Sequence, residues 1–283
     1  MAVISRLHKT IPYDAGNQTR VNIPRQHFLS RLRLRTKTGA LSGGTNGVFI
    51  AGAANKIVKR IELVIGGQLT VATLSFENLR RLNLLAYKDN PPGDGFAYLD
   101  LGLLPTHLFT SLELLVTWES AAPLQTGDRT TITGASLEIF AREIINEGQS
   151  VGKIPLVIRK TISKDLQNVS GDQSIDLLDG NVIQAILIVP SSPTLINSIS
   201  VLQDGTKTHR AKEPYDALRE ENKADFEFDA IQSDFVIVNF DVFGDGSQAL
   251  RTKGMDTLEL VLNTNAEPTG KVELVILEIA QPA

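Results

Sequence analysis

The sequence contains no cysteine among its 283 residues, and this absence excludes several kinds of chemistry at once. Disulfide bonds, zinc–thiolate centres and cysteine nucleophiles all require a thiol. Apolar runs of about 20 residues, the length that a membrane-spanning helix needs, are also missing. The opening stretch MAVISRLHKT lacks the apolar core of a signal peptide, so we expect synthesis in a cytoplasm. Stability must then come from packing or from assembly.

Patterns typical of enzymes are scarce as well. No two of the four histidines, His8, His27, His107 and His209, have the spacing of metal ligands on a helix. The glycine-rich stretches LSGGTNG and GDGSQ lack the strand-to-helix context and the lysine of a phosphate-binding loop. No nucleophile-elbow pattern is present. We therefore predict a protein without catalytic residues and without an organic cofactor.

Two acidic pairs are weak candidates for structural calcium. Asp241 and Asp245 lie beside Gly246, and Asp89 and Asp94 lie in a turn-rich stretch. Calcium takes six to eight oxygen ligands, and neither pair supplies that number alone. Turn formation explains the same residues, because Asp and Gly are the residues that turns favour.

The charges that are present are unevenly distributed. The composition, 42% hydrophobic and 21% charged, is typical of a folded protein, and the net charge is −4. Residues 1–40 contain eight basic side chains and one acidic one, which gives +7 and leaves −11 for the remainder. Such a segment suits contact with nucleic acid, lipid head groups or an acidic neighbouring subunit, whereas the alternative is a solvated strand face.

Short apolar or alternating stretches separated by Gly, Pro, Asn, Asp and Ser indicate β-strands along the whole chain. We predict strands at Phe28–Arg35, Lys56–Ile65, Gln68–Thr73, Ala97–Leu101, Ser111–Trp118, Thr130–Ile144, Ile154–Ile162, Ser174–Leu178, Ile183–Val189, Leu195–Gln203, Phe235–Val242, Thr257–Leu262 and Lys271–Ile279. Gly66–Gly67 and Asp204–Gly205 predict tight hairpins, because both pairs tolerate positive φ angles. Two short helices are expected, one capped by Ser75 and one beginning near Pro214.

These elements recur in the same order in the two halves of the chain. Gly67 corresponds to Gly205 and Leu112 to Leu258, at offsets of 138 and 146 residues. The strands TSLELLVTW and DTLELVLNT then occupy equivalent late positions. A period of about 140 residues is too long for a solenoid and predicts two tandem domains of one fold.

The fold class that follows is all-β, with two tandem eight-stranded antiparallel jelly-roll β-sandwiches and short helices in the loops. We place a basic N-terminal arm at residues 1–20, the first jelly roll at 21–147 and the second at 148–283. The polar, glycine-containing stretch NEGQSVG marks the boundary between the two.

The chain resembles the double jelly-roll major capsid proteins of tailless icosahedral viruses, at the small, corticovirus-like end of that family. The residues that carry the resemblance are NIPRQHFLSRLRLRT, NKIVKRIELVIGGQLTVATLSFENLRRLN and FAYLDLGLL in the first half. The resemblance covers essentially the whole chain, because the second half repeats the order. The loops between strands are small, so large towers are not expected.

The resemblance implies a homotrimer whose six jelly rolls form a pseudo-hexameric tile of an icosahedral virion shell, as in a bacteriophage capsid. Expected partners are the chain itself, neighbouring capsomers, minor capsid or vertex proteins and an internal membrane, without sequence-specific nucleic-acid binding. Synthesis would take place in the host cytoplasm. The N-terminal segment would face inward, and the contacts we expect there are Arg6, Lys9, Arg20 and Arg25. Alternation in RLRLRT instead puts Arg31, Arg33 and Arg35 on one strand face, opposite Leu32 and Leu34.

Two other functions fit tandem β-sandwiches. One is a carbohydrate-binding or glycan-acting protein, which usually displays aromatic platforms that stack on sugars. Aromatic residues make up only 6% of this chain, with Trp118 as the single tryptophan. The other is a minor capsid or spike protein, since one fold serves several structural roles.

Overall fold

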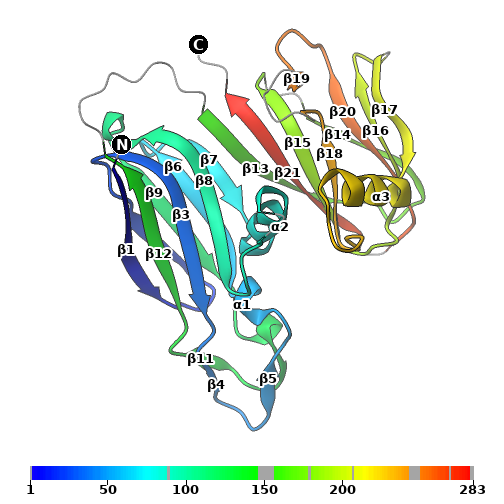
Figure 1. Ribbon diagram of the computed structural model, residues 1–283. Helices are drawn as coiled ribbons and strands as arrows, with labels where there is room; N and C mark the ends of the chain where they lie inside the picture. Colours follow the sequence, from blue (N-terminus) through cyan, green and yellow to red (C-terminus); the bar gives the residue numbers. More distant parts are fainter. Residues whose placement is uncertain are drawn as a thin grey trace. The chain divides into compact units, whose positions relative to one another are not determined.

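The computed structural model describes residues 2–87, 90–145, 156–177, 180–205, 207–241, 249–267 and 269–280. The chain divides into two compact units, Met1–Val157 and Ile158–Ala283. Strands dominate both units, and each carries one 11-residue helix (Figure 1). The domain boundary predicted between residues 147 and 148 lies outside the described residues.

The first unit is built mainly from two four-stranded antiparallel sheets. Its strands are β1 (Val3–Pro12), β2 (Gln18–Asn22), β3 (Phe28–Lys37), β4 (Ala40–Ser42), β5 (Gly47–Phe49), β6 (Val58–Ile65), β7 (Leu69–Leu74), β8 (Phe96–Pro105), β9 (Leu112–Trp118), β10 (Gln125–Gly127), β11 (Thr131–Thr133) and β12 (Ser136–Ile144). Its helices are α1 (Ala53–Lys56), α2 (Phe76–Ala86) and the 3₁₀ turns Thr106–Leu108 and Ala122–Leu124. The sheet orders are β1-β12-β3-β8 and β2-β9-β6-β7.

The second unit repeats this plan. Its strands are β13 (Leu156–Asp165), β14 (Gly171–Asp176), β15 (Val182–Pro190), β16 (Ile196–Gln203), β17 (Lys207–Pro214), β18 (Val236–Asn239), β19 (Leu250–Arg251), β20 (Leu258–Thr264) and β21 (Lys271–Ala280), and its helix is α3 (Tyr215–Asp225). The sheet orders are β13-β21-β15-β18 and β14-β20-β16-β17, and β19 pairs with β15.

The strand order identifies each unit as a jelly roll. If the eight main strands of a unit are numbered along the chain, one sheet has the order 1-8-3-6 and the other 2-7-4-5, in both units. Apart from strands 4 and 5, which form a hairpin within one sheet, successive strands therefore cross from sheet to sheet, as in the two wrapped Greek keys of a jelly roll. The predicted fold class, two tandem eight-stranded jelly rolls, is confirmed.

Alternating burial confirms the equivalence of the late strands. In β9 and in β20 every second side chain is buried, with the same seven-position pattern. Glu113 and Glu259 hold the same half-buried position, second in each strand. Residues that alternate along a strand point to opposite faces of the sheet, so one face of each strand lies in the core.

Both predicted hairpins are present at equivalent places. Gly66 and Gly67 connect β6 to β7 with φ angles of 60° and 72°, and Asp204 and Gly205 precede β17 with φ angles of 50° and 65°. Left-handed backbone at two successive positions suits glycine and aspartate and matches the twist of a hairpin. The Asp204 carboxylate also accepts hydrogen bonds from the backbone N–H groups of Asp256 and Thr257 at 2.8 and 2.9 Å.

A buried asparagine ties the helix of each unit to the sheet. The Asn83 amide of α2 donates to the carbonyl oxygen of Tyr98 and accepts from its N–H, both at 2.7 Å. Asn222 of α3 makes the same pair of bonds with Ile237, at 2.9 and 2.6 Å. Asn222 follows Asn83 by 139 positions in the sequence, and Ile237 follows Tyr98 by the same number. The two helices are thus equivalent, and Ser75 caps α2 as predicted by accepting from the Asn78 N–H at 3.0 Å.

Residues 1–20 differ from the prediction of a separate arm. Val3–Pro12 form β1, which pairs with β12 and has a bulge between Leu7 and Lys9. Gln18–Asn22 form β2, which pairs with β9. The pattern was missed because β1 lies at a sheet edge with most side chains exposed, so its sequence shows no regular apolar alternation. These residues belong to the first jelly roll.

The predicted strand Thr130–Ile144 is also divided. Gly134, with φ 73°, separates β11 from β12, and β11 pairs with β4 instead of continuing the sheet. Together with the pair β5 and β10, these strands form an extension that projects from one end of the first unit (Figure 1). The Asp128 carboxylate accepts hydrogen bonds from the N–H groups of Asn46 (2.7 Å) and Thr45 (3.0 Å), which lower its pKa.

We predict that Asn83→Ala destabilises the protein by roughly 2–4 kcal/mol, because the backbone N–H and carbonyl groups of Tyr98, both partly buried, lose their common partner. Asn222→Ala should have an effect of the same size for the same reason. Urea unfolding followed by circular dichroism measures both. The matched control is Asn90→Ala at an exposed position, and losses below about 0.5 kcal/mol in both buried variants would contradict the proposed role.

Candidate functional site

A basic groove runs along the first unit where β1 approaches the turn after β2. It has a volume of about 670 Å³ and is lined in part by Arg6, His8 and Arg25. His8 Nε2 lies 2.6 Å from the carbonyl oxygen of Asn22, and Arg25 Nη1 donates to the carbonyl oxygen of Phe109 at 2.5 Å. These contacts hold both side chains in place while Arg25 remains exposed.

Arg6 reaches from the edge strand to a buried carboxylate. Its Nη2 lies 3.1 Å from Oε2 of Glu143, whose side chain is fully buried, while the Arg6 side chain is half exposed. Glu278, the counterpart of Glu143 in the second unit, is buried too and accepts from Asn181 Nδ2 at 2.8 Å. An unpaired buried carboxylate is costly, so part of the Arg6 charge serves the fold.

The four predicted inward contacts do not form one site. Arg6 and Arg25 line the basic groove, whereas neither Lys9 nor Arg20 is among its lining residues. Lys9 is exposed on β1 beyond the bulge. Arg20 lies on β2 in the other sheet, where its Nη1 is 3.5 Å from Glu113 Oε2.

A second basic surface lies on the outward side of the sheet β1-β12-β3-β8, and we call it the arginine face. Its five cations are Arg31, Arg33, Arg35, Lys37 and Arg142, and its two carboxylates are Asp100 and Glu138. The predicted alternation in β3 is confirmed, because Leu32 and Leu34 are fully buried on the other side. The outward position of Arg142 and of the aromatic rings was missed, since it depends on how distant strands pair.

Aromatic rings separate the cations on this face. The Arg33 guanidinium lies 4.2 Å from the centre of the Phe140 ring, and Arg35 lies 5.3 Å from that of Phe96. Arg31 lies 5.2 Å from the centre of the Tyr98 ring and donates to Asp100 at 2.5 Å. Such cation–π contacts contribute roughly 0.5–1 kcal/mol at exposed sites, so the guanidinium groups are held over the rings.

Polar contacts around Asp100 and Glu138 stabilise two of the arginines and one lysine. The Tyr87 hydroxyl donates to Asp100 at 2.5 Å, and burial together with this bond raises the pKa of Tyr87. Lys37 and Arg35 both bind Glu138, and the hydrogen bond from Lys37 lowers the pKa of that carboxyl. In the described part of the chain, Arg33 and Arg142 have no carboxylate partner.

The calcium candidates do not form a metal site in the described residues. Asp241 is buried and accepts a hydrogen bond from Gln184 Nε2 at 3.1 Å, while Asp245 lies outside the described residues. Asp94 is ion-paired with Arg80 at 3.2 Å, and Asp89 also lies outside them. Within the ranges that the structure covers, no three His, Asp or Glu side chains are grouped to hold a metal ion.

None of the helices in the described ranges is long and apolar enough to cross a membrane.

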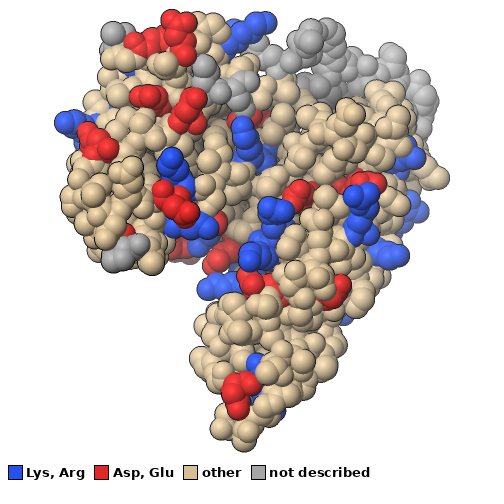
Figure 2. Space-filling view, turned by 180° about the vertical axis from the view of Figure 1, so that it is seen from behind, with Lys and Arg blue, Asp and Glu red and all other residues tan. Residues whose placement is uncertain are grey.

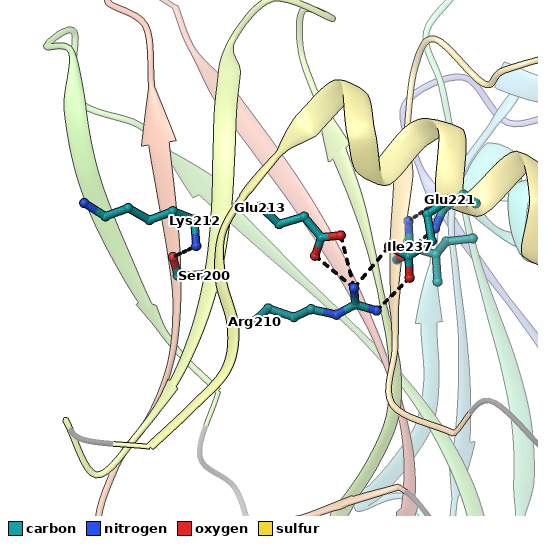
Figure 3. Close-up of polar contacts among 7 residues, drawn as sticks. Ser200, Arg210, Lys212, Glu213, Glu221 and Ile237 are labelled. Atoms are coloured by element: carbon teal, nitrogen blue, oxygen red, sulfur yellow. Dashed lines mark hydrogen bonds and ion pairs between the residues drawn. The ribbon is translucent and has the colours of Figure 1, made fainter.

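The second unit carries an ion network between β17 and α3 (Figure 3). Arg210 Nη1 donates to Glu213 Oε2 at 2.9 Å, and its Nη2 donates to Glu221 Oε1 at 3.0 Å. These bonds from Arg210 lower the pKa of Glu221. Burial, with the neighbouring Glu221, raises the pKa of Glu213. One guanidinium thus holds two carboxylates together at neutral pH.

The two units carry charges of opposite sign. The first unit has 17 basic and 12 acidic residues, a net charge of +5, whereas the second has 11 basic and 20 acidic residues, a net charge of −9. On the side of the molecule that Figure 2 shows, acidic and basic side chains are interspersed. The net charge of +7 in residues 1–40 is therefore one part of a larger difference in net charge between the two units.

The chain has the fold of viral double jelly-roll major capsid proteins. The major capsid protein of Sulfolobus turreted icosahedral virus matches with a TM-score of 0.79 and 17% identity, over 100% of this chain and 98% of that one. The major capsid protein P2 of bacteriophage PM2 matches with a TM-score of 0.70 and 14% identity, also over 100% and 98%. The PBCV-1 virus capsid protein matches with a TM-score of 0.71 and 12% identity, over 99% and 95%.

Sequence comparison finds a related protein family for the second unit. A protein-family model described as "Viral coat protein P2 C-terminal domain" matches residues 158–282. A search of curated protein sequences finds no match. The predicted resemblance to double jelly-roll capsid proteins is confirmed for the fold of the whole chain, and the family match supports it in the second unit.

We predict that Arg210→Met destabilises the second unit by roughly 1–3 kcal/mol at pH 7, because the carboxyl groups of Glu213 and Glu221 lose their common hydrogen-bond donor. The lowered pKa of Glu221 contributes stability above the ordinary glutamate pKa, and this contribution is lost as pH falls through the lowered value. Arg210→Met lacks this contribution, so the difference in unfolding free energy between the variant and the original chain should be smaller at pH 4 than at pH 7. Urea unfolding at both pH values, with Arg251→Met at an exposed position as control, measures the difference. An equal deficit at both pH values would contradict the assignment.

Proposed function

We propose that this chain is a capsid subunit, a structural protein of a virion that assembles with copies of itself. The observation that supports this most is the double jelly roll, which covers the whole chain and nearly the whole length of two capsid proteins. The family match of the second unit points in the same direction. The site of action is then the virion shell, and synthesis takes place in the host cytoplasm.

The duplicated fold supports a trimeric building block. Three copies of a chain with two equivalent jelly rolls supply six rolls, which can surround a threefold axis as a pseudo-hexamer. Such a tile packs into an icosahedral lattice. Neighbouring capsomers and minor capsid or vertex proteins are the partners that this arrangement requires.

The carbohydrate-binding alternative has less support. Trp118 is buried, with its Nε1 donating to Thr19 Oγ1 at 3.1 Å and its ring against Tyr13, so it offers no face to a sugar. A minor capsid or spike role is the nearer alternative, and the number of copies per virion separates it from the shell role.

We expect the purified chain to form trimers, and larger assemblies at higher concentration. Mass photometry from nanomolar concentrations upward, followed by electron microscopy, measures this. A chain that stays monomeric at every concentration would contradict the proposal, whereas trimers without a lattice would favour the minor role.

The basic residues Arg6, Lys9, Arg20 and Arg25 face the interior in this proposal, toward a membrane or the genome. Arg25 and Lys9 support it best, because both are exposed and neither is ion-paired to a carboxylate in the described residues. Arg6 and Arg20 have acidic partners within the chain and contribute less free charge.

We predict that Lys9→Glu combined with Arg25→Glu weakens binding to phosphatidylglycerol vesicles, or to DNA, by roughly tenfold or more, since each basic residue near an anionic membrane contributes about 1 kcal/mol. Co-flotation and a filter-binding assay measure the two cases. Lys164→Glu with Lys207→Glu, at exposed positions of the second unit, is the matched control. Unchanged binding in both assays would refute the inward role of these residues.

A further inference from the structure

The arginine face contains a hollow whose lining includes three arginine side chains. Its volume is about 360 Å³, and its lining includes Arg31, Arg33, Arg142, Tyr98 and Phe140. Arg142 stands directly opposite Arg31 on the neighbouring strand. Like charges at opposed positions destabilise a sheet, so this arrangement has a cost within the unit alone.

Two of the three arginines have guanidinium N–H donors that no carboxylate of the described residues accepts from. Arg31 is bound to Asp100, whereas Arg33 and Arg142 lack a carboxylate partner among the described residues. A guanidinium has five N–H donors in a planar fork that suits carboxylate and phosphate oxygens. The stacking of Arg33 on Phe140 fixes its orientation without using those donors. The hollow is therefore built to receive an anionic group.

The second unit presents a matching surface, which we call the acidic segment. Residues 225–234, DFEFDAIQSD, contain four acidic side chains and no basic one. Asp225 and Asp229 are exposed and have no partner in the part of the chain that the structure describes. Ile231 lies between the acidic positions and is 39% exposed, so the segment also offers apolar surface.

The acidic segment is ordered by contacts with its own unit. The Phe228 ring lies against Phe226 and the buried Phe235, at centroid distances of 5.8 and 6.2 Å. Arg219 Nε donates to the carbonyl oxygen of Gln232 at 2.9 Å. A segment that is already ordered loses little conformational entropy on binding.

We propose that the hollow of the arginine face binds the acidic segment of a second copy of this chain. The inference rests on the proposed self-assembly and deepens it by naming two surfaces that meet. Charge complementarity carries it, because the face belongs to the unit of net charge +5 and the segment to the unit of −9. Arg33 and Arg142 bind carboxylates of the segment, and Phe140 and Tyr98 pack against its apolar residues.

A second copy fits the face better than a phosphate polymer. Arginine interleaved with tyrosine and phenylalanine is the composition of protein–protein contact sites. Lysine accompanies arginine on many phosphate-binding surfaces, but no lysine in the described ranges lines the hollow. The contact joins two different surfaces, so repeated copies form a closed ring when the rotation between them allows it.

The test uses charge reversal in the full-length chain, with mass photometry as the readout. The hollow pair is Arg33→Glu with Arg142→Glu, the segment pair is Asp225→Lys with Asp229→Lys, and a fourfold variant combines them. We expect each pair to raise the concentration at half-assembly by at least about tenfold, because like charges then meet. The fourfold variant should return to within about threefold of the original chain, since the charges are complementary again.

The controls separate this inference from the proposed function. Lys56→Glu with Lys59→Glu, at exposed positions outside both surfaces, should assemble normally. Circular dichroism and thermal melting verify folding, and if the hollow pair does not fold, Arg142→Glu alone replaces it at an exposed position.

The possible outcomes are distinct. If the original chain never assembles, the proposed function fails together with the contact. If it assembles and both pairs do so equally well, or if the fourfold variant is not restored, the contact alone is refuted. A hollow pair that assembles normally but loses binding to DNA or phosphatidylglycerol vesicles would show that the face binds phosphate instead.

Discussion

The burial of Leu32 and Leu34 determines where the charges of the first unit lie. Both leucines are fully buried in the core between the two sheets, and each contributes about 1.5–3 kcal/mol relative to an exposed position. A shift of β3 by one residue would turn these leucines outward and three arginines inward, so the register is strongly fixed. Arg31, Arg33 and Arg35 must then stand on the outer side. Pairing with β12 brings Phe140 and Arg142 beside them, and the arginine face is complete.

The two units have kept the interactions that hold the fold and diverged in charge. Asn83 and Asn222 still tie equivalent helices to equivalent strands, and Glu143 and Glu278 are both buried. These groups have no access to water that could replace their partners, so changing them is costly. Exposed positions carry no such constraint, and their charges sum to opposite signs in the two units.

The sequence predicts the fold well wherever a strand has one buried side. The hairpins at Gly66–Gly67 and Asp204–Gly205 and the cap at Ser75 depend on local residues, and the structure confirms them. It also confirms the equivalence of Leu112 and Leu258, which follows from the order of the elements along the chain. The exposed edge strands β1 and β17 were missed because exposed strands need no apolar alternation.

The candidate site could be predicted only in part, because its members come together through pairing of distant strands. The alternation of Arg31, Arg33 and Arg35 is visible in the sequence, whereas the position of Arg142 follows from a register more than 100 residues away along the chain. The four basic residues at the N-terminus were predicted to share one role, but Arg6 and Lys9 lie on one sheet, Arg20 lies on the other, and Arg25 lies in the turn after β2. Arg6 also serves a buried glutamate, which no local pattern indicates.

A duplicated fold creates an assembly problem that the charge difference can solve. Two similar jelly rolls in one chain offer similar surfaces, so contacts between two first units or two second units compete with contacts between unlike units. With net charges of +5 and −9, like units repel each other and unlike units attract. Discrimination of this kind needs an unfavourable wrong contact as much as a favourable correct one. In the contact that we propose, the opposed arginines of the hollow supply both the repulsion between like units and the attraction between unlike ones.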